Sequence, residues 1–149
     1  MALSFMYTLQ YNLLKTMRNQ ISKWFPALLV MLVIFYFSAQ PSSDLPIFGW
    51  ADAIFKKGGH MIGYALLALS YWRALDYKPE KRWTVWFLAM LYAVTYEFHQ
   101  SFVPGRHPSL WDVVIFDNFG ALISLWFASL YRKQKRLDPM GPVVEEANR

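Results

Sequence analysis

The fold of this chain is decided by the stretch Leu110–Tyr131, which reads LWDVVIFDNFGALISLWFASLY. A helix over this stretch rises about 33 Å, enough to cross the roughly 30 Å hydrocarbon core of a bilayer. Three further apolar runs precede it, at residues 24–39, 59–75 and 83–103, in a chain of 149 residues that is 56% hydrophobic and only 17% charged. Four such helices in succession leave little polar surface to meet water. The sequence therefore predicts an all-α polytopic membrane protein built as a bundle of four transmembrane helices.

Basic residues gather on one side of the predicted bundle. Twelve of the fifteen lysines and arginines lie in the N-terminal segment, the second connection or the tail: Lys15, Arg18, Lys23, Arg73, Lys78, Lys81, Arg82, Arg132, Lys133, Lys135, Arg136 and Arg149. The positive-inside rule then places both termini in the cytoplasm and the protein in the plasma membrane as a multi-pass protein. The sequence pI near 9.5 follows from this topology, and no motif for a nucleic-acid partner accompanies the basic residues.

Three segments follow from this arrangement. Residues 1–23 form an N-terminal cytoplasmic segment, for which a helix lying on the inner leaflet and a disordered leader are equally compatible with the sequence. Residues 24–131 form the four-helix transmembrane domain, and residues 132–149 form a basic tail with too few apolar residues to fold alone. The chain has no cysteine, which excludes disulfides and thiolate chemistry.

Small residues recur about every four positions in the third and fourth runs and lead to a carboxylate in each. These stripes are Ala89, Ala93 and Glu97 in the third run, and Asp117, Gly120, Ser124 and Ala128 in the fourth. Because small residues let helices approach closely, the carboxylates are expected to point into the bundle near its outer end. Ionisable groups within membrane helices are costly and mark functional sites.

The candidate site is built around these carboxylates. We assign Glu97 and His60 to proton transfer, and Lys57, Tyr64, Gln100, Arg106 and Asp117 to substrate binding. Lys57, His60 and Tyr64 share one face at the start of the second helix, and Gln100 lies one turn after Glu97. The lysine and Arg106 would hold an anion, while imidazole and carboxylate would relay a proton.

Structural roles compete with these assignments. Glu97 paired with Arg106 would only pin the loop between the third and fourth helices. The pattern Ser109-x-x-Asp112 is typical of a capping box, so Asp112 is predicted to be a helix cap. Asp117 lies too deep in its helix to act as a cap and needs a partner from another helix, with His60 or Arg106 as the candidates.

Metal binding is disfavoured by the spacing of the acidic and histidine residues. His60, Glu97 and Asp117 can meet in space, but the sequence contains no HExxH or paired-histidine motif. We therefore predict neither a metal nor another cofactor.

The ordered set of motifs resembles the VanZ-like family. Its parts are Ser38-Ala39-Gln40, Lys57-x-x-His60-x-x-x-Tyr64, Glu97-x-x-Gln100, Pro104-Gly105-Arg106, Ser109-x-x-Asp112, and Asp117 or Asn118 before Gly120. The family is named for a teicoplanin-resistance accessory protein, so the resemblance implies a membrane protein of the cell envelope linked to glycopeptide resistance.

Two hypotheses of function follow. In the first, an outer-facing pocket binds or acts on an anionic envelope lipid or peptidoglycan-precursor headgroup. In the second, the protein is a structural or assembly subunit whose polar cluster only locks the bundle. The expected partners are membrane lipids, an anionic lipid-linked ligand, and a partner membrane protein or a second copy of the chain. The residues leave catalysis and binding open.

Overall fold

The structure is a computed structural model that describes residues 2–40, 52–105 and 109–137, and these residues contain helices and turns but no strand. The elements are α1 (Ala2–Ala39), α2 (Asp52–Ala74), the short 3-10 helix η3 (Pro79–Lys81), α3 (Arg82–Gln100), α4 (Leu110–Asp112), the π-helical segment η4 (Val113–Asp117) and α5 (Asn118–Leu137). The predicted all-α class is confirmed.

Two stretches of helix are long and apolar enough to cross a membrane, namely Phe5–Ala39 and Leu110–Lys135. The second stretch joins α4, η4 and α5 without a break. The helices α2 and α3, of 23 and 19 residues, match two other predicted spans in position but are not among these two stretches. That all four helices cross the membrane therefore stays a prediction.

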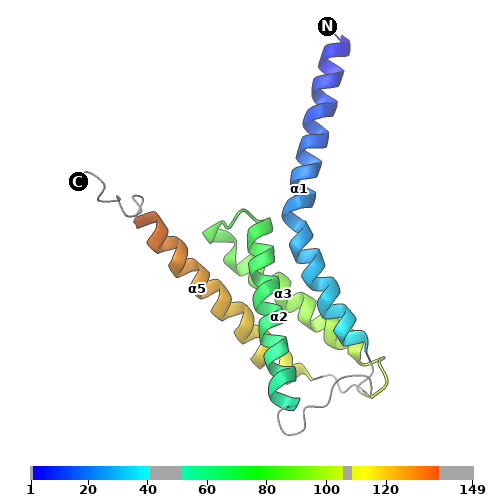
Figure 1. Cartoon of the computed structure of the whole chain (residues 1–149), viewed down its shortest axis with the longest axis vertical. Coiled ribbons are helices and arrows are strands. Elements are labelled where there is room, and N and C mark those ends of the chain that lie inside the picture. The colour runs from blue at the N-terminus through cyan, green and yellow to red at the C-terminus, as the bar shows by residue number, and fades with distance from the viewer. Residues whose placement is uncertain (1, 41–51, 106–108, 138–149) are drawn as a thin grey trace, which may run out of the picture.

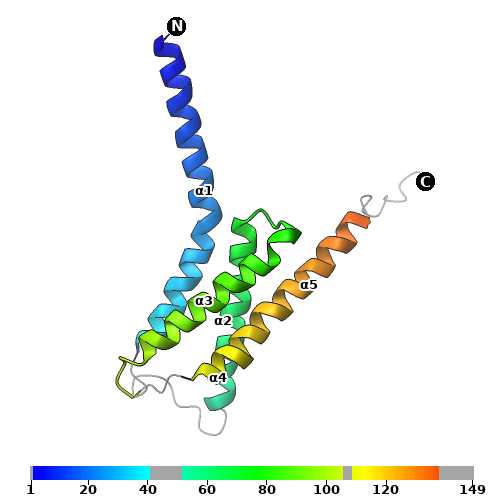
Figure 2. The same ribbon diagram turned by 180° about the vertical axis from the view of Figure 1, so that it is seen from behind.

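Helix α2 is the centre of the bundle and packs against α1, α3 and α5 (Figures 1 and 2). Its inward face buries Tyr64, Leu67, Ala68, Tyr71 and Trp72. The approach of α5 to α2 is so close that a Cβ atom on Gly120 would overlap the backbone of Met61. This close approach brings the polar residues of α2 and α5 together.

Large apolar side chains cover the outside of the bundle. Exposed residues of this kind occur on every long helix, for example Leu32 on α1, Leu66 on α2, Leu91 on α3 and Phe127 on α5. Water-soluble proteins rarely expose apolar surface on this scale, whereas a bilayer solvates it. The outer surface of the bundle is thus suited to contact with lipid.

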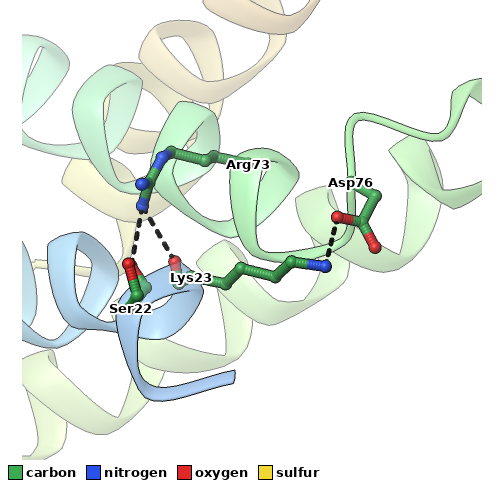
Figure 3. A network of polar contacts seen from close by, with 4 residues as sticks. All are labelled: Ser22, Lys23, Arg73 and Asp76. Atoms are coloured by element: carbon green, nitrogen blue, oxygen red, sulfur yellow. Dashed lines mark hydrogen bonds and ion pairs between the residues drawn. The ribbon is translucent and has the colours of Figure 1, made fainter. Parts of the chain in front are cut away.

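Helix α1 is continuous from the N-terminal segment into the first predicted span, so residues 2–23 are helical. The helix changes direction part-way along (Figure 1) and contains Pro26. Proline has no N–H to donate to the carbonyl four residues earlier, which here belongs to Ser22. Arg73 of α2 supplies the missing donor, with Nη1 lying 3.0 Å from the Ser22 oxygen and 3.2 Å from that of Lys23 (Figure 3).

The two ends of the bundle differ in composition. The turn between α2 and α3 and the last turns of α5 lie at one end, which we call the basic end (Figures 1 and 2). The start of α2, the end of α3 and α4 lie at the opposite end, which we call the loop end. Helix α5 continues to Leu137, so residues 132–137 of the predicted tail are helical; the rest of the tail lies outside the described residues.

Candidate functional site

A buried contact between His60 of α2 and Asp117 of the π-helical segment η4 forms the centre of the candidate site at the loop end. Nδ1 of His60 lies 3.0 Å from Oδ1 of Asp117. The Asp117 side chain is 0% exposed and that of His60 is 19% exposed. The prediction that Asp117 takes a partner from another helix is confirmed, and that partner is His60.

The π-helical segment places Asp117 at its last position. The N–H of Asn118 bonds to the carbonyl of Val113, five residues earlier, so the turn is one residue wider than an α-helical turn. A single π turn inside a helix changes the direction in which the following side chains point, and such turns are frequent at functional sites. No feature of the sequence signalled this turn.

Glu97 lies near His60 and Asp117 and is only 4% exposed. Its Oε2 atom accepts a hydrogen bond of 2.7 Å from the backbone N–H of Ser109, the residue that precedes α4. Glu97 thus ties the end of α3 to the start of α4. The sequence alternative that paired it with Arg106 falls on a residue outside the described part of the chain.

The capping box predicted at the start of α4 is not formed, because the hydrogen bonds that define it are absent from this part of the described chain. Ser109 occupies the position before the helix with an extended backbone, but its side chain makes no capping hydrogen bond. Its N–H, which Asp112 would accept in a capping box, is already bound by Glu97. A carboxylate from a neighbouring helix has taken the place of the local cap.

Three tyrosines form a series of contacts that leads from His60 to α1. The ring of Tyr96 makes edge-on contacts with His60 at 5.8 Å and with Tyr64 at 6.4 Å between centroids. Tyr92 packs on Tyr64 at 6.5 Å and donates its hydroxyl to the carbonyl of Met31 on α1 at 2.7 Å. The predicted residue Tyr64 is therefore beside His60, whereas Tyr92 and Tyr96 had no predicted role.

Two buried polar atoms of this cluster have no hydrogen-bond partner among the described residues. They are Oδ2 of Asp117 and the hydroxyl of Tyr64. Buried polar groups are nearly always satisfied because the loss of hydration is costly. These two atoms are the groups that a bound molecule or water would satisfy.

Two of the remaining predicted site residues, Gln100 and Lys57, lie in the described part of the chain. Gln100 is buried at the end of α3. Lys57 is exposed, and its Nζ lies 4.8 Å from the ring centroid of Phe116. Arg106 lies outside the described residues. Of the two predicted anion-holding cations, the structure thus describes only Lys57, which lies on the same helix as His60.

Carboxylates dominate the electrostatics of the described cluster. His60 interacts electrostatically with Asp117, Asp112 and Glu97. Within residues 2–40, 52–105 and 109–137, no group of three or more histidines, cysteines, aspartates or glutamates has an arrangement that could hold a metal ion. Imidazole and carboxylate groups can form hydrogen bonds and exchange protons.

Comparison with protein families gives one result. A family described as VanZ/LLP1 matches residues 3–132. The chain belongs to the VanZ/LLP1 family. Family membership, with two helices long and apolar enough to span a bilayer, identifies it as a membrane protein. Neither curated proteins nor solved structures include a match to the chain.

The polar residues of this VanZ/LLP1 protein extend beyond the predicted site. Asn118 accepts a hydrogen bond of 2.8 Å from Nε1 of Trp86, so it links α5 to α3. His99 stacks on Phe35 of α1 with ring centroids 4.6 Å apart.

Proposed function

We propose that this VanZ/LLP1 protein binds the headgroup of an anionic envelope lipid or peptidoglycan precursor at the loop end. The observation that carries the proposal is the pair of unsatisfied buried atoms, Asp117 Oδ2 and the Tyr64 hydroxyl, beside a partly exposed His60. A carboxylate oxygen accepts hydrogen bonds and cannot donate them. The ligand must therefore offer hydroxyl or amide donors to Asp117, besides a negative charge for Lys57.

Peptidoglycan precursors and glycosylated envelope lipids fit this requirement, since they combine phosphate with sugar hydroxyls or amides. Lys57 supports the charged part of the proposal because it is exposed at the same end of the bundle, and Arg106 is proposed as the second cation. Gln100 adds a buried amide on the same helix as Glu97. Ligands of this kind also agree with a role in glycopeptide resistance.

Proton transfer is the catalytic form of the proposal. An aspartate bound to Nδ1 holds an imidazole in one tautomer and leaves Nε2 as the nitrogen that can take a proton from a ligand. The 3.0 Å contact between His60 and Asp117 has this form. Glu97 is the second proton-transfer candidate, and its bond to Ser109 orients its carboxylate.

We propose that both termini lie in the cytoplasm and that the loop end faces the outside. The described lysines and arginines of the α2–α3 turn and of α5 support this orientation because they gather at the basic end. The same orientation makes the protein a multi-pass protein of the plasma membrane with four spans.

The proposal is tested by native mass spectrometry of the protein released from vesicles that contain a polyprenyl-diphosphate-linked peptidoglycan precursor. We expect Asp117→Asn to retain less precursor than the wild-type protein, because an amide replaces the acceptor that the ligand bonds. Asp112→Asn is the matched control, since it removes an equal charge from the same end without touching the buried pair. Equal retention by both variants and the wild-type protein would refute ligand binding at this site.

A structural lock is the second candidate function. The bonds from His60 to Asp117 and from Ser109 to Glu97 favour it, because each joins two elements of the bundle. This candidate predicts that Glu97→Gln lowers the stability of the protein and that no ligand is retained by the wild-type protein. Turnover of a lipid-linked substrate that is lost in a folded Glu97→Gln variant would instead establish an enzyme.

A further inference from the structure

A groove at the basic end lies between α5 and the start of α3, on the opposite side of the bundle from the polar cluster. It consists of a cavity of about 390 Å³ and an adjoining one of about 170 Å³, which share Arg82 and Trp126. The larger cavity is also bordered by Arg132 and Lys133, and the smaller by Leu122 and other apolar residues. Three cationic side chains thus border the groove, and large apolar side chains line much of the rest.

The two arginines of the groove are held by neutral groups. Arg82 donates from Nε to the carbonyl of Pro79 and from Nη1 to the hydroxyl of Ser129, each at 3.2 Å. The guanidinium of Arg132 lies over the ring of Tyr77, with its carbon 3.7 Å from the centroid. These contacts fix the position of both guanidinium groups without neutralising their charge.

Carboxylates do not offset this charge within the described residues. The acidic residues between α2 and α3 are Asp76 and Glu80, and Asp76 forms an ion pair of 2.6 Å with Lys23 of α1 (Figure 3). Glu80 is exposed and forms no ion pair with another described residue. Arg82, Arg132 and Lys133 are therefore available to an external anion.

The apolar part of the groove has the character of a membrane interface. The smaller cavity is lined by Trp83, Trp86, Leu122, Leu125 and Trp126 together with Arg82. Tryptophans occur where a chain passes from the headgroup layer to the hydrocarbon, and arginine side chains extend toward the headgroups. Cationic side chains next to an apolar lining match a phosphate followed by acyl chains.

We propose that this groove binds one anionic glycerophospholipid of the surrounding bilayer. Its phosphate would be held by Arg82, Arg132 and Lys133, because guanidinium groups bind phosphate with two parallel hydrogen bonds. An acyl chain lies against Leu122 and Trp126. The site lies at the opposite end from the proposed headgroup site and uses none of its residues, so either proposal can fail without the other.

The test measures lipid retention by native mass spectrometry after release from vesicles of equal parts phosphatidylglycerol and phosphatidylethanolamine. The groove variant is Arg82→Gln with Lys133→Gln. The control variant is Lys81→Gln with Lys135→Gln, which removes the same charge from exposed positions at the same end and outside the groove. We expect the ratio of retained phosphatidylglycerol to phosphatidylethanolamine to fall at least about tenfold in the groove variant, because the loss of one charge-assisted hydrogen bond already accounts for about tenfold and the variant removes two cations. We expect the ratio to stay at the wild-type value in the control.

An equal fall in both variants would overturn the proposal, because it would show attraction by diffuse charge. An unchanged ratio in the groove variant would also overturn it. A second measurement needs no charge substitution and uses lipids with brominated acyl chains, which quench tryptophan fluorescence. We expect brominated phosphatidylglycerol to quench the wild-type protein more than brominated phosphatidylethanolamine does. This difference should shrink in Trp126→Phe. Equal quenching by the two lipids in the wild-type protein would refute the site even if the groove variant failed to fold.

Discussion

Replacement of Gly120 by alanine tests the close contact of α2 and α5 on which the candidate site depends. A Cβ at this position would lie 2.9 Å from both the carbonyl carbon and the Cα of Met61, and still closer to the carbonyl oxygen. Ordinary contacts of a Cβ begin near 3.4 Å, so the helices must separate by at least half an ångström. The obstructing atoms are backbone, which cannot rotate away as a side chain would.

The size of the effect follows from two opposing contributions. Overpacking of this kind costs about 3 kcal/mol at the upper end of its usual range, while alanine in place of glycine stabilises a helix by about 1 kcal/mol. We therefore expect Gly120→Ala to lower the free energy of unfolding by about 2 kcal/mol. The measurement is denaturation in detergent micelles, followed by circular dichroism.

Gly59→Ala is the matched control, since a Cβ on Gly59 would meet no atom within 4 Å. We expect this variant to be as stable as the wild-type protein or up to about 1 kcal/mol more stable. If Gly120→Ala were as stable as Gly59→Ala, the close approach of α2 and α5 would be incorrect. The contact between His60 and Asp117 would then be incorrect as well, because His60 is the residue next to Met61.

Two further predictions concern the contacts of α1 with the α2–α3 turn. Arg73→Gln should lower the free energy of unfolding by about 1 kcal/mol, because it removes the donor to the Ser22 carbonyl. The loss should be smaller in a Pro26→Ala background, where residue 26 regains an N–H for that carbonyl. Equal losses in both backgrounds, measured by the same denaturation, would contradict this. Lys23 lowers the pKa of Asp76 by a hydrogen bond and by its charge, so the stabilisation is present above pH about 4 and is lost as the pH falls through the lowered pKa. The thermal midpoint should therefore fall more for the wild-type protein than for Asp76→Asn when the pH is lowered from 5 to 3, a range that brackets the ordinary carboxyl pKa of about 4. Parallel falls in the two proteins would exclude the linkage.

The sequence by itself determined the helices and the faces they present. Apolar runs at 59–75 and 83–103 correspond to α2 (Asp52–Ala74) and α3 (Arg82–Gln100), because a long apolar run without an internal proline favours a continuous helix. The stripe leading to Glu97 predicted a buried carboxylate, and Glu97 is buried. Helical periodicity carries this information because it depends only on spacing along the chain.

Tertiary structure alone decided which groups these side chains bind. Glu97 bonds to the backbone N–H of Ser109, and Arg73 bonds to the carbonyl of Ser22. Every residue offers a carbonyl, and all but proline an N–H, so such partners leave no mark in the sequence. The π turn is formed by a hydrogen bond between the backbone groups of Asn118 and Val113, so it also leaves no mark in the sequence. The sequence determined where the polar residues lie along each helix, and the packing of the helices determined that His60 and Asp117 meet.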